Sequence, residues 1–453
     1  MKRTVLLYVF FLMPAVAAIA QPAKPKEKAK PETPQKVMIT PYGFVRNYLN
    51  FDSRRTMTVC GGEYNMIPYD EDWNITEVQA AVYGDEERFD RNAVPETHLL
   101  ALSTRFGLKL EGPQLLGANS SGRIETDFAG FGNNNTVLRL RLAYMRLDWG
   151  GKIGQSLTIG QDWHPLSGDI MPEVLGMAAG APFRPHSRTP QVSYTCWLPW
   201  RFGFTAAALW QYQFTSPGPD GESAAYANRA LAPELFVGLN YSDERINAQL
   251  GVDYTNLDIR REIAIVDGIS GLELYKHLDE SHCLSFSPTL YFQYTEGKFA
   301  MKFRSTLAEN LGHLTMLSGY AMVTKQSDPS FMGYKPMRSS VSYLNFAYGT
   351  RWRADLFLGY QKNLGLAEGY NIAGFALVGA DNLYMKKGVD NINSIYRVAP
   401  SISFNTSAFN IGLEYECTAV TYGDLQADGT VAGNDNLRQV VNHRICALVK
   451  YNF

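Results

Sequence analysis

Apolar and polar residues alternate with a period of two along most of this chain, in runs of about ten residues. The segments RFGLKLE at 105–111, VLRLRLAYMRLDW at 137–149 and FAMKFRST at 299–306 show the pattern clearly. Since successive side chains of a β-strand point to opposite faces, each run would form a strand with one apolar and one polar face. Helical periodicity is almost absent after residue 36. The chain is therefore expected to be all-β.

Sixteen such runs can be marked along the chain, and the connections between them differ in length in a regular way. Connections after the even-numbered strands are mostly short, such as LPW at 198–200. Connections after the odd-numbered strands are mostly long, as at 52–96 and 310–338. The predicted strands span 39–51, 97–111, 121–131, 137–149, 156–162, 190–198, 201–214, 233–242, 245–257, 283–295, 298–309, 339–348, 351–362, 394–405, 408–419 and 439–453.

Short connections at one end and long connections at the other are typical of an outer-membrane barrel, with tight periplasmic turns and long external loops. A sheet in hydrocarbon cannot leave an edge strand unpaired, because each orphan amide costs several kcal/mol there, so the sheet must close. An even strand number then puts both termini in the periplasm. The predicted fold is a transmembrane antiparallel β-barrel of about 16 strands. The alternative is a soluble secreted sandwich or propeller, but Phe202 and Phe204 share one apolar face of their strand.

Composition agrees with a barrel and excludes a polytopic helical membrane protein. Of the 453 residues, 45% are hydrophobic and 19% are charged, and the mean hydropathy is -0.19. A membrane helix needs a run of about 20 apolar residues, and the only long run is at the very start. Length alone would suggest about three soluble domains. Because no internal seam is visible, residues 37–453 are expected to form one barrel.

The first 36 residues carry the signals of an exported chain. A basic start, MKR, precedes an apolar stretch at 4–17 and the small-residue motif AIA at 18–20. This arrangement predicts a cleaved secretory signal peptide at 1–20, with an uncleaved anchor helix as the alternative. Residues 21–36 are rich in Pro and Lys and lack an apolar face, which predicts an extended periplasmic linker.

The cysteines and the last residues add two smaller expectations. The C-terminus alternates Val449, Tyr451 and Phe453, which resembles the closing-strand signature recognised by the outer-membrane assembly machinery. The cysteines are odd in number and lack C-x-x-C spacing, so single strand residues are expected rather than a disulfide framework, although an exported chain could oxidise a pair. They are Cys60, Cys196, Cys283, Cys417 and Cys446.

If the apolar faces meet lipid, the opposite faces point into the lumen and carry more basic than acidic residues. The acidic wall residues are Glu111, Glu125, Asp127, Asp162, Glu234, Asp253, Asp355, Glu414 and Glu416. The basic wall residues expected to line the pore and set its selectivity are Arg46, Arg105, Arg123, Arg139, Arg141, Lys302, Arg304, Arg351 and Arg353. Further basic wall residues are Lys109, Arg201, Lys298, Arg444 and Lys450.

A basic lumen with low-dielectric walls would raise the local concentration of anions. The alternative for each arginine is a structural ion pair across the wall. Glu125 and Asp127 on one predicted strand face Arg139 and Arg141 on the next, so these four groups could neutralise one another. Both interpretations stay open at the level of the sequence.

The connection at 164–189 has an unusual composition for a solvated loop. It is rich in small and apolar residues and carries a basic end, HSR at 186–188. A sixteen-strand barrel is wide enough for an aqueous channel, and we expect this connection to fold into the lumen and narrow it. A loop packed on the outer rim or at a subunit interface is the alternative. Its charged candidates for the constriction are Asp169, Glu173, Arg184, His186 and Arg188.

Four successive segments carry a family resemblance, namely SGRIETDFAGF at 121–131, LRLRLAYMRLDWG at 138–150, LTIGQDWHPL at 157–166 and RTPQVSY at 188–194. In this order and spacing they resemble the trimeric outer-membrane porins of the DcaP-like group, within the sixteen-stranded porin superfamily. The resemblance implies a homotrimer, a constricting third loop and passive uptake of small anionic solutes such as dicarboxylates. The Pro/Lys spacer departs from the coiled-coil extension that such porins can carry.

Enzymatic and cofactor chemistry is not predicted. None of the seven histidines lies in a G-x-S-x-G or H-E-x-x-H setting. The segment KHLDESHC at 276–283 offers metal-ligand residue types, but a chance polar cluster in a loop is the expected interpretation. Phosphate-binding glycine motifs and nucleic-acid-binding patches are missing from the sequence.

The predicted function is therefore passive diffusion of small hydrophilic solutes, preferably anions, through an outer-membrane porin. Its surroundings would be the lipid of a Gram-negative outer membrane. The alternative is a non-conducting barrel that serves as an adhesin or structural scaffold, because long external loops serve either purpose.

Overall fold

The computed structural model describes residues 37–453, except 60–63, 85–87, 133–134, 168–170, 177–179, 267–272, 376–380, 386–388 and 433–435. The predicted signal peptide at 1–20 and the predicted linker at 21–36 lie outside the described residues, as do Cys60 and Asp169. The four cysteines within the described part are free thiols. None of the described helices combines the length and the apolar character that crossing a bilayer requires.

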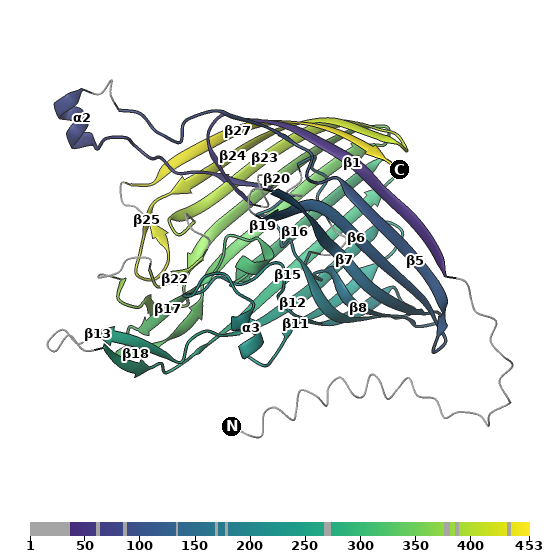
Figure 1. The fold of residues 1–453 in the computed structure, drawn as a ribbon, viewed down its shortest axis with the longest axis horizontal. Coiled ribbons are helices and arrows are strands. Elements are labelled where there is room, and N and C mark those ends of the chain that lie inside the picture. Colours follow the sequence, from purple (N-terminus) through teal and green to yellow (C-terminus); the bar gives the residue numbers. More distant parts are fainter. Residues whose placement is uncertain are drawn as a thin grey trace. The chain divides into compact units, whose positions relative to one another are not determined.

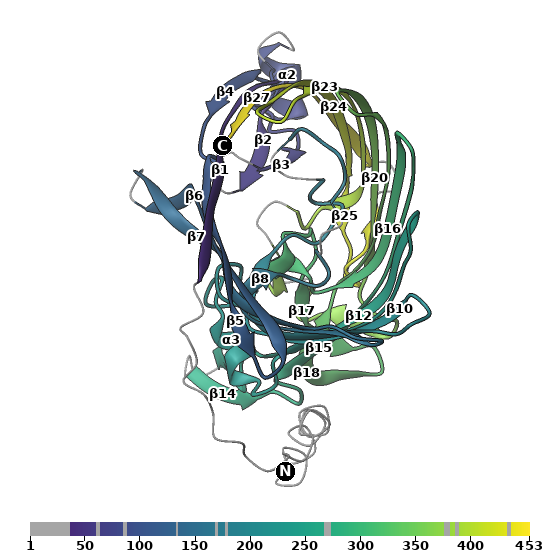
Figure 2. The ribbon, with the colours of Figure 1, turned by 90° about the vertical axis from the view of Figure 1, so that its right-hand side faces the viewer.

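The described chain forms a closed antiparallel barrel of 16 strand positions (Figures 1 and 2). Each of the sixteen predicted runs corresponds to one position, so the predicted fold class is confirmed. In order around the barrel the strands are β1 (Met38–Asp52), β5 (Arg105–Leu115), β6 (Ala118–Gly132), β7 (Asn135–Trp149), β8 (Gly154–Trp163), β9 (Arg188–Trp197), β10 (Phe202–Leu209), β11 (Glu234–Ser242), β12 (Ile246–Asp258), β15 (His282–Glu296), β16 (Phe299–Glu309), β19 (Arg338–Gly349), β20 (Trp352–Gly365), β23 (Ile392–Asn405), β24 (Phe409–Tyr422) and β27 (Arg438–Asn452).

Two features of the ring follow from the strand pairings. The predicted strand at 97–111 is broken into β4 (Glu96–Leu100) and β5, which pair with successive parts of β1. The ring closes because β27 pairs with β1. At this seam Gly43 and Phe453 exchange two backbone hydrogen bonds of 3.1 Å each.

The long connections carry short elements that the period-two pattern did not predict, because pieces of two to nine residues are too short to show it. They gather at one end of the barrel, called here the long-connection end (Figure 1). They are β2 (Thr56–Val59), β3 (Tyr64–Pro68), α2 (Glu77–Tyr83), α3 (Ala225–Arg229), β13 (Glu262–Val266), β14 (Glu273–His277), η2 (Gly312–Leu314), β17 (Tyr320–Lys325), β18 (Asp328–Pro336), β21 (Tyr370–Ile372), β22 (Leu383–Tyr384), β25 (Asp424–Leu425) and β26 (Val431–Ala432). The opposite end carries the tight turns and is called the short-turn end.

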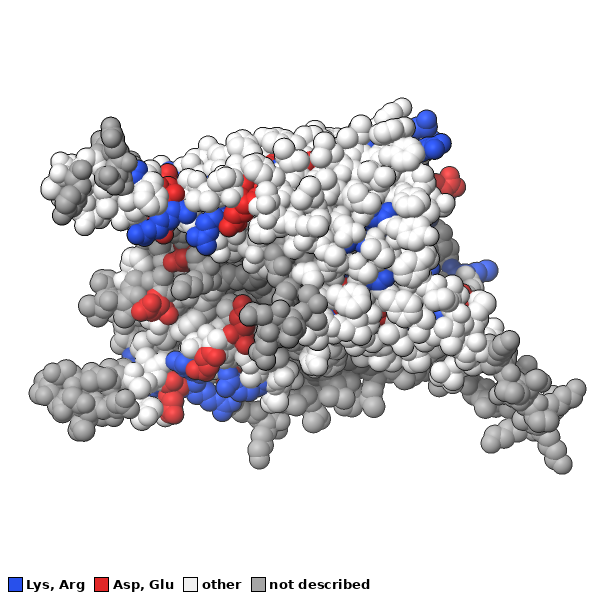
Figure 3. Space-filling model, turned by 45° about the horizontal axis from the view of Figure 1, so that its top comes forward, with Lys and Arg blue, Asp and Glu red and all other residues white. Residues whose placement is uncertain are grey.

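The outer face of the barrel is apolar. On β15, Leu284, Phe286 and Leu290 are 49%, 53% and 45% exposed, whereas Ser285 and Ser287 between them are buried. The side of the barrel in Figure 3 shows few charged side chains along the wall, while acidic and basic groups gather toward the long-connection end. A continuous apolar exterior of this kind suits contact with hydrocarbon.

The packed core lies inside the ring. Figure 2 looks along the barrel and shows β2 and β3 within the ring of strands. Side chains from these connections and from the inner wall form one buried apolar cluster, which includes Met66, Phe183, Leu314 and Phe357. The long connections therefore fold inward against the wall, and they position the groups described next.

Candidate functional site

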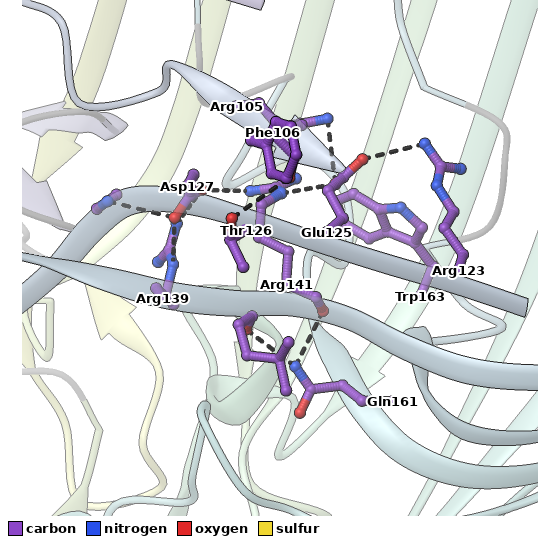
Figure 4. A network of polar contacts seen from close by, with 12 residues as sticks. Arg105, Phe106, Arg123, Glu125, Thr126, Asp127, Arg139, Arg141, Gln161 and Trp163 are labelled. Atoms are coloured by element: carbon purple, nitrogen blue, oxygen red, sulfur yellow. Dashed lines mark hydrogen bonds and ion pairs between the residues drawn. The ribbon is translucent and has the colours of Figure 1, made fainter. Parts of the chain in front are cut away.

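An inward-facing network of charged side chains joins β5, β6 and β7 (Figure 4). Arg141 lies at its centre, where its Nε donates to Glu125 Oε1 at 2.9 Å and its Nη1 donates to Asp127 Oδ2 at 2.7 Å. Arg139 donates to both carboxylate oxygens of Asp127, at 2.9 and 2.8 Å. Such charge-assisted, partly bidentate contacts are the strong class of hydrogen bond in proteins.

This network holds more guanidinium groups than carboxylates. Arg105 and Arg123 also approach Glu125, with N–O distances of 3.4 and 3.0 Å, so four arginines share two carboxylates. Arg123 is 33% exposed and Arg105 is 18% exposed, whereas Arg141 is only 2% exposed. The surplus positive charge is thus presented to water by the outer arginines, while the central one is structural.

Strand register explains why these residues meet. In an antiparallel pair, directly opposite residues lie on the same face, and Asp127 is paired opposite Arg139. Arg141 lies two residues beyond Arg139 on β7 and also points inward, and it is the extra residue at the register shift between Thr126 and Glu125. Gln161 of β8 donates its side-chain amide to the backbone carbonyls of Leu140 and Arg141, beyond the point where the β7–β8 pairing ends.

The first two described parts of the connection at 164–187, residues 164–167 and 171–176, contact inward-facing side chains of β16 and β20. Lys302 Nζ lies 2.7 Å from Glu173 Oε1, and Arg353 Nη2 lies 3.2 Å from the same oxygen. Arg304 donates to the backbone carbonyl of Leu166. The predicted residues Glu173, Lys302, Arg304 and Arg353 are therefore brought together inside the barrel.

The last part of this connection is held by a packed ring and by an arginine. The rings of Phe183 and Phe357 lie 5.9 Å apart between centroids. Arg397 of β23 donates to the carbonyl of Ala181 at 2.9 Å and to the carbonyl of Met66 in β3 at 2.6 Å. One buried guanidinium thus ties two inward-folded connections to the wall.

His186 links the same two connections. Arg184 Nη2 lies 2.6 Å from His186 Nδ1, and Tyr64 Oη lies 2.9 Å from His186 Nε2. Because a guanidinium can only donate, Nδ1 accepts, and the imidazole proton is on Nε2. Burial, together with the positive charge of Arg184 and Arg188, holds the pKa of His186 well below its ordinary value. His186 is therefore a neutral, structural hydrogen-bonding group.

Several predicted site residues are buried by the inward-folded connections. Arg184 and Arg188 are fully buried, and Arg304 is 1% exposed. The guanidinium of Arg188 lies 5.1 Å from the centre of the Trp163 ring. Arg46 faces inward, with its guanidinium 4.6 Å from the centre of the Phe44 ring. What these residues contribute to selectivity stays a prediction, and Asp169 lies outside the described residues.

The prediction that Arg351 lies on the lumen wall is wrong. It lies in the tight turn between β19 and β20, is exposed, and stacks 5.0 Å from the centre of the Phe404 ring. The predicted strand at 351–362 began one residue too early, because β20 starts at Trp352. Arg351 is therefore at the short-turn end and not on the lumen wall, whereas Arg353 faces inward.

Two kinds of functional residue escaped the sequence analysis. Arg397 shares its face with Ile395 and Ala399, and both are buried, so an apolar inner face looked like a lipid-facing one. The contacts of His164 and His313 depend on how two distant connections fold, and no local pattern shows this.

The polar residues at 276–283, which the sequence analysis interpreted as a chance cluster in a loop, lie in different surroundings. His277 belongs to β14, Glu280 pairs with Lys335 at 2.6 Å, and Cys283 is buried in a separate apolar cluster. These residues do not converge on one point.

Comparison with known proteins identifies the fold. No protein-family model and no curated protein matches the sequence. The anion-selective porin from Comamonas acidovorans has a TM-score of 0.48 at 11% identity, covering 92% of this chain and 100% of that chain. OmpT of Vibrio cholerae has a TM-score of 0.48 at 10% identity, covering 92% and 98%. The DcaP outer membrane channel of Acinetobacter baumannii has a TM-score of 0.59 at 16% identity, covering 92% of this chain and 97% of that chain. The chain therefore has the fold of the DcaP channel, as its sequence resemblance predicted.

Proposed function

We propose that this protein is an outer-membrane porin through which small hydrophilic solutes diffuse, with a preference for anions. The fold supports the first part, because a solved structure that shares it is described as an outer membrane channel. The apolar exterior supports residence in a bilayer. No covalent step is required of any residue.

The single observation that carries the anion preference is the composition of the charged network on β5, β6 and β7. Four guanidinium groups share two carboxylates there, and Arg105, Arg123 and Arg139 are partly exposed inside the barrel. Water-facing positive charge in a bore with low-dielectric walls concentrates anions and repels cations. Small carboxylates fit this chemistry, since guanidinium groups bind carboxylates in pairs of hydrogen bonds.

The second candidate is a non-conducting barrel that serves as an adhesin or scaffold. The observation in its favour is the buried cluster inside the ring, which joins Met66, Phe183 and Leu314 from three different connections. If this packing closed the bore, the arginines would serve structure alone.

Planar-bilayer recordings on the purified protein test both candidates. We expect stable current steps and, under a salt gradient, a reversal potential of the sign that marks anion selectivity. Well-folded protein without current steps would favour the scaffold. A cation-selective reversal would contradict the anion preference and leave the channel in place.

The surroundings and assembly are part of the same proposal. We expect a homotrimer in the Gram-negative outer membrane, with both termini in the periplasm and a secretory signal removed at residue 20. The terminal Phe453 would be read by the outer-membrane assembly machinery. Cross-linking of the purified protein tests the trimer, and labelling of single cysteines placed in the tight turns tests the orientation.

A further inference from the structure

Four buried side chains from four different elements meet on one side of the barrel interior. His164 follows β8 and opens the third long connection, and His313 lies in η2 of a later connection. Glu234 and Asp253 point inward from β11 and β12. All four are at most 5% exposed. Neither the proposed channel nor the arginine network uses them.

The distances within this group are those of a compact ligand set. His164 Nε2 lies 2.7 Å from Glu234 Oε1 and 3.8 Å from Asp253 Oδ1, and the three ligand atoms lie within 4.8 Å of one another. His313 Nε2 lies 3.1 Å from both oxygens of Glu234. A zinc ion bound at about 2.0 to 2.2 Å keeps neighbouring ligand atoms about 3 to 3.5 Å apart, so small adjustments would suffice.

A second observation points to a bound cation. Asp253 is 1% exposed, and its Oδ1 is buried without a hydrogen-bond partner while its Oδ2 accepts from Thr255. Among the described residues, no lysine or arginine forms an ion pair with Glu234 or Asp253. Two neighbouring carboxylates buried in this way need compensating positive charge.

A cavity borders one member of the group, Glu234. A cavity of about 90 Å³ lies between the connection that holds α3 and strands β10 to β12, and Glu234, Thr255 and Gln211 are among its lining residues. Its volume is enough for several waters. A hydrated ion could therefore reach Glu234 without opening the barrel.

We propose that His164, Glu234 and Asp253 bind one divalent transition-metal ion, with His313 as the fourth ligand or as the group that orients Glu234. Imidazole and carboxylate donors together suit Zn²⁺ better than Ca²⁺ or Mg²⁺, which prefer oxygen ligands alone. The ion would fasten two inward-folded connections to the wall, because His164 and His313 belong to different connections.

Binding through His164 Nε2 requires a change in the tautomer of this histidine. The Leu166 N–H donates to His164 Nδ1 at 3.1 Å, so the imidazole proton is on Nε2 and is donated to Glu234. A metal on Nε2 requires the other neutral tautomer, with this proton on Nδ1, so the Leu166 N–H would have to turn away from Nδ1. A doubly protonated imidazole cannot bind the ion. Affinity should therefore fall as the solution is acidified and imidazole protonation competes.

The test uses the full chain without a histidine tag, refolded in detergent and treated with a chelator. On adding Zn²⁺ at a pH of about 7.5, we expect one ion per chain by elemental analysis and a Tm higher by several degrees. Asp253→Asn should weaken Zn²⁺ binding by tenfold or more while the shape of the side chain is kept. His443→Gln, which changes a half-exposed histidine on the lipid side of β27, is the matched control.

Two results would overturn the proposal. One is a folded barrel that takes up no Zn²⁺ and whose Tm does not respond to the ion, which would leave the group as a hydrogen-bonded clamp. The other is equal Zn²⁺ binding by Asp253→Asn and the unchanged chain. If Asp253→Asn does not fold, His313→Gln replaces it. Zn²⁺ binding is measured independently of conduction, so failure of the channel proposal would not affect this test.

Discussion

The ring of Phe183 occupies the space that a side chain at position 359 would need. A Cβ atom added to Gly359 on β20 would lie 2.6 Å from Phe183 Cγ. The backbone of Gly412 on β24 is approached in the same way, since its Cβ would lie 2.6 Å from Leu175 Cδ1. Two apolar side chains of the third long connection thus pack directly against the backbone of two glycines of the inner wall.

Gly359→Ala should loosen this connection. The added methyl group must displace the Phe183 ring or shift β20, and overpacking of this kind typically costs about 1 to 3 kcal/mol. We expect a lower Tm and larger current fluctuations in single-channel recordings. Gly150→Ala is the matched control, because nothing lies within 4 Å of a Cβ there. If Gly359→Ala and the unchanged chain gave identical recordings, the contact between Phe183 and Gly359 would have no influence on the current.

A pair of neighbouring arginines offers a test of the anion preference. Arg353 faces the lumen and lies 3.2 Å from Glu173, whereas Arg351 lies in a tight turn against Phe404. Arg353→Gln should therefore reduce anion selectivity, seen as a smaller reversal potential, and Arg351→Gln should change it little. If Arg351→Gln had the larger effect, selectivity would be set at the mouth of the short-turn end and not on the wall.

Arg141→Ala should affect stability more than selectivity. The substitution leaves Glu125 and Asp127 buried without their central partner, and breaking a buried ion pair in this way costs about 3 to 5 kcal/mol. We expect a clear loss of Tm in detergent. Arg245→Ala removes an exposed pair with Glu296, 62% and 53% exposed, and should leave Tm nearly unchanged. Equal stability of the two variants would show that Arg141 is dispensable to the wall.

A pH-dependent contact is expected in the first long connection. Burial alone would raise the pKa of Asp90, but hydrogen bonds from the Asp72 and Asn92 backbone N–H groups and from Arg54 lower it overall. A carboxyl group whose folded pKa is depressed stabilises the fold above its unfolded pKa of about 3.8 and loses this contribution as the pH falls through the lower folded value.

Asp90→Asn should therefore reduce hydrogen-exchange protection of residues 69–92 at neutral pH. The difference from the unchanged chain should shrink as the pH falls below about 3.8. A difference that persists unchanged down to the lowest pH would show that the carboxylate charge is not what orders this connection. Asp328→Asn, at the exposed start of β18 in another connection, serves as a control for general effects of acid.

The sequence predicts the ring of strands well, because each strand repeats one signal many times. The exposed Leu284 and Phe286 alternate with the buried Ser285 and Ser287. Because the alternation is repeated along each strand, one residue that departs from it does not change the prediction of a strand. Alternation does not distinguish the two faces of a strand where the inner face is itself apolar, as around Arg397 with Ile395 and Ala399. There the inward-folded connections, and not water, cover the wall.

The parts of the candidate site that depend on tertiary folding could not be predicted. Arg123, Glu125, Arg139 and Arg141 share two adjacent strands, so strand order alone brings them together. His164 and Glu234 come from separate connections and strands, and their contact is set only when the long connections pack. Turn positions are equally uncertain, and a boundary error of one residue misplaced Arg351.

The pairing of β1 with β27 has a consequence for biogenesis. The barrel cannot close before β27 is available to pair with β1. Until then two rows of backbone amides lack partners, and a protein cut short before residue 438 would keep both as permanent open edges. A truncation that removes only β27 should therefore be as damaging as one that removes most of the barrel, and such products should be removed by proteases.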